Sequence, residues 1–245
     1  MLVLGDSHAS SPARRDALLS AYDTVDPAVA LHVGDLEYYD VSVPTWFVAG
    51  NNEDFEVIDA LRTGEKREDV RNVNLLASTA TTVQGVRVAG LSGNFAPTRY
   101  DQDREELSGA RRRHFTRSEV ERAAALDNVD VFLTHEAPTG LFWFGYDPGC
   151  EHIRTLLETL DAKLCLVGHF HRHHSDKIAG VQTVALGPTW EQYYHSIRKI
   201  WSCRFTRYQS RRTHPIDSRL GWLWLGSPGV FSNTVRGRAS SGVAS

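Results

Sequence analysis

Two histidines that lie two residues apart, His169 and His171, follow the apolar stretch 164–167 and Gly168. Side chains at positions i and i+2 of an extended segment point to the same side, so both imidazoles can face one point. Imidazole is the commonest side-chain ligand of protein-bound metal ions. The pair therefore indicates a metal site just beyond the end of a buried strand.

The same arrangement occurs at the start of the chain, where Asp6 and His8 follow the apolar residues 2–4 and Gly5. Three further apolar stretches also end in polar side chains that can bind a metal. The full set of candidate ligands is Asp6, His8, Asp35, Asn51, His135, His169 and His171. Taken singly, Asp6, Asp35 and Asn51 also have a non-metal interpretation, as turn residues that follow strands.

Seven donors exceed the four that a structural zinc site takes. The mixture of oxygen and nitrogen donors suits two divalent cations, manganese foremost, with iron, zinc or nickel as alternatives. Two such ions share a bridging carboxylate and hold both the attacking and the leaving oxygen of a phosphoryl transfer. They also lower the pKa of bound water, which makes hydroxide available near neutral pH. The ligand set thus predicts a two-metal centre.

Elements that would position these residues alternate along the chain. Apolar stretches predict strands at 2–5, 28–33, 45–49, 73–76, 79–83, 86–91, 129–133, 164–167 and 181–186. Helices are predicted at 12–22, 54–63, 118–126 and 151–160, with a surface loop or irregular helix at 94–114. Strands alternating with helices at both ends, around a hairpin, indicate a layered α/β fold with mixed sheets. Ligand sites in such folds gather beyond the carboxyl ends of the strands.

Five motifs, Asp-x-His, Gly-Asp, Gly-Asn-x-Glu, Thr-His and Gly-His-x-His, occur in this order. In this respect the chain resembles the calcineurin-like metallophosphoesterases over residues 1–190. The resemblance implies a four-layer αββα sandwich of two mixed β-sheets and hydrolysis of phosphoric esters. It implies a first metal held by Asp6, His8 and His171, a second held by Asn51, His135 and His169, and Asp35 as the bridge.

The third motif departs from the family pattern, because Asn52 stands where the family usually has a histidine that contacts the phosphate. An amide can donate a hydrogen bond to a phosphate oxygen but is no general acid at neutral pH. We therefore expect Asn52 either to bind the substrate phosphate or to serve only in a turn.

The expected reaction is hydrolysis of a phosphodiester, or of a phosphomonoester, by in-line attack of a metal-bridging hydroxide, with Asp35 and Asn52 as catalytic residues. One alternative is a non-catalytic scaffold on the same fold. The other is a nuclease related to RNA debranching enzymes, suggested by residues 134–138.

Some neighbouring residues have two interpretations. Glu53 is expected to orient its loop or cap the next helix, and His32 to be a core residue. The aromatic segment 143–146 either lines a substrate pocket or packs as a loop.

Composition separates an acidic body from a basic tail. The chain has 27 basic and 30 acidic residues, of which nine basic residues and one acidic residue lie in 196–245. The net charge is therefore +8 in 196–245 and −11 in the rest of the chain. We expect a metallophosphoesterase domain at 1–195 and a tail at 196–245 that is disordered or a non-native extension. Contact of this tail with nucleic acid is the alternative.

No apolar stretch reaches the roughly 18 residues of a membrane-spanning helix, so a membrane partner is not expected. Three cysteines without metal-type spacing favour a reduced, cytoplasmic protein. The expected partner is a phosphate-ester substrate, with nucleic acid as a further candidate.

Overall fold

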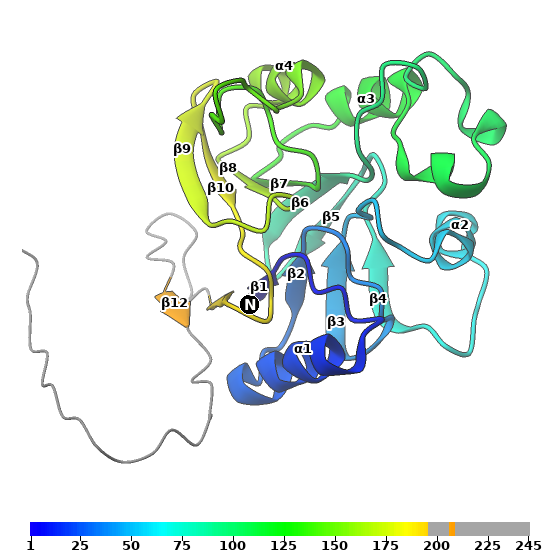
Figure 1. The fold of residues 1–245 in the computed structure, drawn as a ribbon, viewed down its shortest axis with the longest axis vertical. Coiled ribbons are helices and arrows are strands. Elements are labelled where there is room, and N and C mark those ends of the chain that lie inside the picture. The colour runs from blue at the N-terminus through cyan, green and yellow to red at the C-terminus, as the bar shows by residue number, and fades with distance from the viewer. Residues whose placement is uncertain (196–205, 209–245) are drawn as a thin grey trace, which may run out of the picture. The chain divides into compact units, whose positions relative to one another are not determined.

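Residues 1–195 and 206–208, which the computed structural model describes, contain two six-stranded sheets (Figure 1). In spatial order the first sheet contains β12 (Thr206–Tyr208), β11 (Tyr193–His195), β1 (Leu2–Leu4), β2 (Ala30–His32), β3 (Asp40–Phe47) and β4 (Arg71–Leu75). The second contains β5 (Thr79–Val83), β6 (Val86–Leu91), β7 (Val131–Thr134), β8 (Leu164–Val167), β10 (Val181–Ala185) and β9 (His174–Ile178).

Both sheets are mixed. Strands β1 to β4 pair in parallel, as do β6, β7, β8 and β10, whereas β11, β12, β5 and β9 pair antiparallel with their neighbours. The parallel strands bring their carboxyl ends to one edge of each sheet, where ligand sites of α/β folds form.

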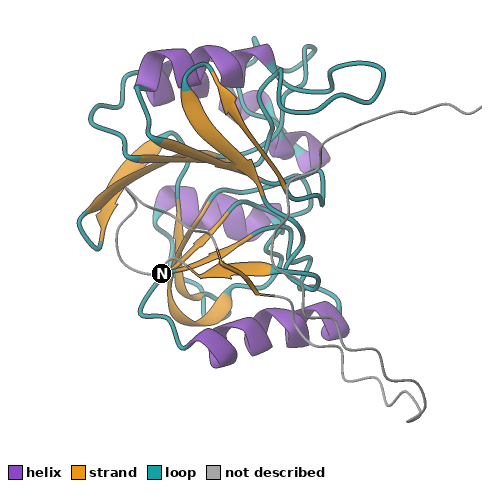
Figure 2. Ribbon diagram, turned by 90° about the vertical axis from the view of Figure 1, so that its left-hand side faces the viewer, coloured by secondary structure: helices purple, strands orange, loops and turns teal. Residues whose placement is uncertain are grey.

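Figure 2 shows helices above the upper sheet and a helix below the lower sheet, and the apolar clusters place each helix on the outer face of one sheet. Helices α1 (Pro12–Val25) and α2 (Phe55–Thr63) pack on the first sheet, and α3 (Arg117–Ala124) and α4 (Glu151–Leu160) pack on the second. Two short 3₁₀ helices, Arg104–Glu106 and Gly109–Arg113, occupy the segment expected to be irregular. The layers follow the order α, β, β, α, which confirms the fold class expected from the sequence.

Alternation along the strands separates the core into layers. On β8, Leu164 and Leu166 belong to the apolar cluster between the sheets, whereas Cys165 and Val167 belong to the cluster beneath α3 and α4. Because both faces of the strand are buried, its sequence is apolar throughout and does not alternate with polar residues.

Sequence periodicity missed the strands that carry few buried apolar side chains. Strand β9 has four exposed residues followed by buried Ile178, and it pairs with β10 across the Ala179–Gly180 turn. Strand β3 begins at Asp40, five residues before its predicted start, and its register shifts between Asp40 and Thr45. An exposed edge strand needs no apolar alternation, so its sequence gives little signal.

The predicted tail at 196–245 lies outside the described residues apart from 206–208, where β12 pairs with β11. In the part of the chain that the structure describes, no helix is both long and apolar enough to cross a membrane.

Candidate metal centre

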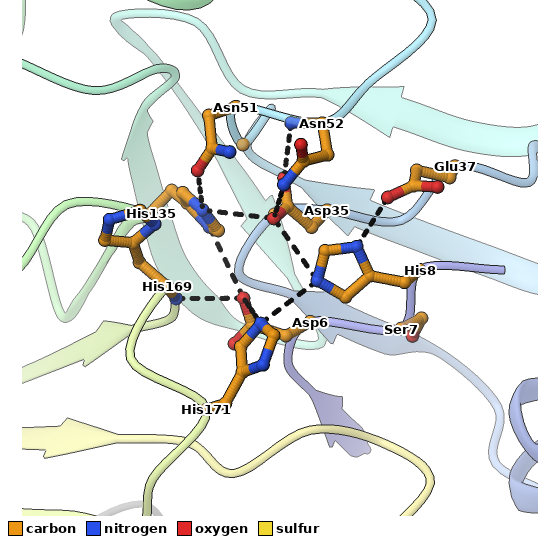
Figure 3. A network of polar contacts seen from close by, with 12 residues as sticks. Asp6, Ser7, His8, Asp35, Glu37, Asn51, Asn52, His135, His169 and His171 are labelled. Carbon is orange, nitrogen blue, oxygen red and sulfur yellow. Dashed lines mark hydrogen bonds and ion pairs between the residues drawn. The ribbon is translucent and has the colours of Figure 1, made fainter. Parts of the chain in front are cut away.

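Every candidate ligand lies just past the carboxyl end of a parallel strand. Asp6 and His8 follow β1, Asp35 follows β2, and Asn51 follows β3 in the first sheet. From the second sheet, the loops after β7 and β8 supply His135, His169 and His171. Figure 3 shows the seven side chains turned toward one another across the junction of the two sheets. The structure therefore brings together all the candidates that the sequence identified.

One group of side chains surrounds a point on the β1 side. Ligand atoms of Asp6, His8, Asp35 and His171 all lie within 4.8 Å of one another. His8 Nε2 is 3.0 Å from His171 Nε2 and 3.5 Å from Asp35 Oδ2. These four residues are the expected first ligand set together with the expected bridge.

Asp6 supports occupation of this group by a cation. Its Oδ2 is buried and has no hydrogen-bond partner among the described residues, whereas Oδ1 accepts the His169 backbone N–H at 2.9 Å. An ionised carboxylate oxygen that is buried without a partner is costly, and a bound cation removes that cost. The donor atoms present thus fit a divalent metal ion.

A second group surrounds His135. Its Nδ1–H donates to the Val33 carbonyl at 2.8 Å, so Nε2 carries the free lone pair. This Nε2 lies 3.2 Å from Asn51 Oδ1 and 3.5 Å from Asp35 Oδ2, and the His169 ring lies 5.1 Å from the His135 ring. Asp35 Oδ2 is thus equally close to a histidine of each group, the position that a bridging ligand requires.

The backbone at the centre is strained at many positions. Six residues there have left-handed φ angles, namely Asp6 (44°), His8 (46°), Asp35 (55°), Glu37 (58°), His169 (72°) and His171 (50°). Such conformations cost free energy in non-glycine residues and cluster at functional sites. The sequence alone gave no sign of this strain.

Two glycines permit the close approach of these loops. A Cβ on Gly34, whose φ is +100°, would lie 2.8 Å from His135 Cγ, and one on Gly50 would lie 2.6 Å from the Asp35 backbone nitrogen. Any side chain at either position would push the ligand loops apart.

Glu37 is a functional residue that sequence reasoning missed. Its Oε1 accepts from His8 Nδ1 at 2.6 Å, and its Oε2 accepts from the Ser10 hydroxyl. This hydrogen bond raises the pKa of His8, directs Nε2 toward Asp35 and makes the imidazole a stronger ligand. No spacing rule connects Glu37 with His8, because the two meet only when the loops after β1 and β2 lie side by side.

Glu53 holds the ligand loops together. Its carboxylate accepts the backbone N–H groups of Leu36 and Gly50 on Oε1, at 3.1 and 3.2 Å. Its Oε2 accepts the N–H of Glu37 at 3.1 Å and the hydroxyl of Tyr39 at 2.7 Å. Burial, together with nearby Asp35, raises the pKa of Glu53. The expected loop-orienting role is the one seen here, and the adjacent Asp54 caps α2.

Asn52 contacts Asp35 in this structure. Its side-chain amide donates to Asp35 Oδ2 at 2.9 Å and its backbone N–H donates to Oδ1 at 2.8 Å. Burial alone would raise the pKa of Asp35, but His135 and these two hydrogen bonds lower it. The amide thus helps to keep the central carboxylate ionised, a role not considered from the sequence.

A buried chain of hydrogen bonds supports the loop after β1. His32 Nδ1 accepts the Gly34 N–H, so its Nε2–H donates to Ser7 Oγ at 2.7 Å. The Ser7 hydroxyl lies 2.9 Å from that of Thr189, which donates to the Gly5 carbonyl. Burial lowers the pKa of His32 to about 3 and keeps it neutral. This histidine is a core residue, as expected, and it positions the segment between Asp6 and His8.

Protonation across the centre is set by burial and by the close carboxylates. Burial raises the pKa of Asp6 to about 6, and Asp35 adds to the rise. Burial and His135 lower the pKa of His169 to about 4. Burial alone would lower the pKa of His135, but the carboxylates of Asp35 and Asp6 outweigh it and raise the value. Above pH 6 the centre therefore offers ionised carboxylates to a cation.

An aromatic side chain lies beside each ligand group. The Trp190 ring lies 5.6 Å from the His171 ring and 5.8 Å from the His8 ring. Beside the second group, the Phe170 ring lies 5.3 Å from that of His169 and 4.7 Å from that of Phe142.

The expected aromatic segment 143–146 adjoins Phe170. Phe144 stacks at 6.2 Å on Phe170, and Trp143 and Tyr146 are 74% and 63% exposed. Phe144 therefore packs against the neighbouring rings, as one of the two interpretations expected, and the substrate-pocket interpretation of the segment stays a prediction.

Comparison with known proteins gives a family and a fold. A family model for the calcineurin-like phosphoesterase superfamily domain matches residues 1–198. No curated protein matches the chain in a sequence search. One solved structure superposes with a TM-score of 0.58 at 14% identity, covering 79% of this chain and 92% of the other. Another, TT1561 of Thermus thermophilus, gives 0.57 at 16% identity, covering 79% and 91%. At these identities the likeness shows the fold alone.

Proposed function

The chain belongs to the calcineurin-like phosphoesterase superfamily, and from this we propose that it hydrolyses phosphodiesters with two divalent metal ions bound between its sheets. A metal-dependent phosphoesterase is the general function that the family and the ligand cluster support. The observation that carries the proposal is the position of Asp35 Oδ2, 3.5 Å from a histidine nitrogen in each of two ligand groups.

The chain offers a complete ligand set for each ion. Asp6, His8 and His171 would hold the first, Asn51, His135 and His169 the second, and Asp35 would contact both. When bound, two such ions activate a water molecule as the nucleophile and neutralise charge on the phosphate. Manganese is the proposed metal, since oxygen and imidazole donors without thiolates suit it.

The residues around the centre favour a diester over a monoester. Asn52 provides no proton for a leaving alkoxide, and its amide is directed at Asp35. A phosphodiester carries one negative charge and an organic group on either side of phosphorus. The partly exposed rings of Trp190 and Phe170, one beside each ligand group, give each organic group an apolar surface.

The first test compares hydrolysis of bis-p-nitrophenyl phosphate and p-nitrophenyl phosphate by the manganese-loaded protein, with Asp35→Ala as the control and metal content measured for both. Turnover of the diester above the monoester, lost in the variant, would support the proposal. Faster turnover of the monoester would refute the diester preference. No turnover and no bound metal would favour a scaffold on the same fold.

A further inference from the structure

Arg14 lies at the edge of the candidate metal centre. It belongs to the first turn of α1, and its guanidinium carbon is 4.2 Å from the centroid of the Trp190 ring. That ring in turn contacts the rings of His8 and His171. A single indole therefore separates this cation from the first ligand group.

The donors of Arg14 are not used elsewhere in the described part of the chain. Its side chain is exposed and stacks on Trp190, its charge acts on nearby His171, and no hydrogen bond or ion pair of its guanidinium is found among residues 1–195 and 206–208. The next residue differs: Arg15 donates to the carbonyls of Ala9 and Ser10 and stacks on Tyr38. Arg15 thus ties the loop to the helix, whereas Arg14 presents its N–H groups to solvent.

Stacking gives Arg14 the properties of a recognition group. The indole face restricts the long side chain, so less conformational entropy is lost when the guanidinium forms a hydrogen bond. The planar fork of N–H donors matches the paired oxygens of a phosphate or a carboxylate. This cation also stands out because residues 1–195 carry net negative charge.

We propose that Arg14, held on Trp190, binds a second anionic group, a phosphate or a carboxylate, on the substrate whose scissile phosphate lies at the metal centre. The inference rests on the proposed function and adds the substrate class, namely a phosphodiester with a further negative charge on its retained alcohol. Arg14 is then a residue that determines specificity and takes no part in bond cleavage.

Three chromogenic diesters test this substrate class. All are p-nitrophenyl phosphodiesters of a three-carbon alcohol, whose far end is a methyl, a carboxylate or a phosphate group. We expect the manganese-loaded protein to turn over the better of the carboxylate and phosphate substrates with a kcat/KM roughly 10- to 100-fold above that of the methyl substrate, as a charged hydrogen-bonded pair implies. Arg14→Gln should remove the preference, so that the variant turns over the three substrates with similar kcat/KM. Arg111→Gln, at an exposed arginine of the second 3₁₀ helix, should retain it.

A binding experiment separates this inference from the proposed function. Titration calorimetry of the manganese-loaded protein would use propylphosphonate, 2-carboxyethylphosphonate and propane-1,3-bisphosphonate, none of which is hydrolysed. Tighter binding of a ligand that carries a second anionic group, lost in Arg14→Gln, supports the inference even if no diester is turned over. Comparison of the carboxylate and bisphosphonate ligands identifies the preferred anion. Equal affinities in the wild type, a preference unchanged in Arg14→Gln, or no binding of any of the three overturns it.

Discussion

Replacing Glu53 with glutamine tests how the ligand loops are held together. If the amide oxygen of the new side chain keeps the place of Oε1, it still accepts from Leu36 and Gly50. The amide nitrogen then faces the Glu37 N–H and the Tyr39 O–H, and both donors lose their acceptor, although the Tyr39 oxygen, which already accepts the Asp54 N–H, can also accept from the amide. The variant therefore strands one backbone donor and one hydroxyl donor and weakens the remaining bonds from charged to neutral.

The magnitude follows from these contacts. A buried donor left without a partner costs about 1–3 kcal/mol, and each charge-assisted bond that becomes neutral loses about 1 kcal/mol. Removing a buried carboxylate whose pKa is raised offsets part of this loss. We expect Glu53→Gln to lower the free energy of unfolding by about 2–4 kcal/mol. Since the loops carry Asp35 and Asn51, metal affinity should fall about 10- to 100-fold.

Urea unfolding of the metal-free protein, followed by tryptophan fluorescence, measures the first effect, and titration with manganese measures the second. Glu65→Gln is the matched control, because Glu65 is an exposed glutamate just beyond α2 and its replacement should change neither quantity. A Glu53→Gln variant that unfolds within about 0.5 kcal/mol of the wild type, with unchanged metal affinity, would refute the role of Glu53.

Three further predictions concern the centre and the outer layers. Glu37→Gln should weaken metal binding by about 10- to 100-fold, because His8 loses its carboxylate partner, and calorimetry with manganese measures the change. Metal affinity of the wild type should rise with pH through about 6, since Asp6 and His8, both with raised pKa values, must release protons to a metal; affinity that stays constant between pH 5 and 8 would contradict this. Burial alone would raise the pKa of Glu119, but the charges of Arg62 and Arg104 outweigh burial and lower it. The ionised Glu119 therefore stabilises the fold at a pH above its unfolded-state pKa, and this stabilisation is lost as the pH falls through the lower folded-state pKa. Glu119→Gln should accordingly cost about 3–5 kcal/mol at pH 7 and less in acid, and equal losses at pH 7 and pH 3 in urea unfolding would count against the ion pair.

The sequence predicted elements whose character is local. Helix α4 and strand β8 have the predicted bounds, because an amphipathic or fully apolar stretch is visible within the segment itself. Strand β9 and the early start of β3 escaped prediction, since few of their side chains enter the core and pairing with a neighbouring strand defines them.

By itself the sequence determined the chemical types of the candidate ligands and their placement after strands. A strand followed by a glycine and a pair of polar residues can be recognised from residues only a few positions apart. The parallel order of the strands then brings these ends to one edge of the sheet. Only the tertiary structure decided which side chains support them. Glu37 reaches His8, Glu53 joins two loops, and Trp190 presents Arg14, all through contacts between segments far apart in the chain. Such contacts depend on how the two sheets and their loops pack, and no local pattern of residues records that packing.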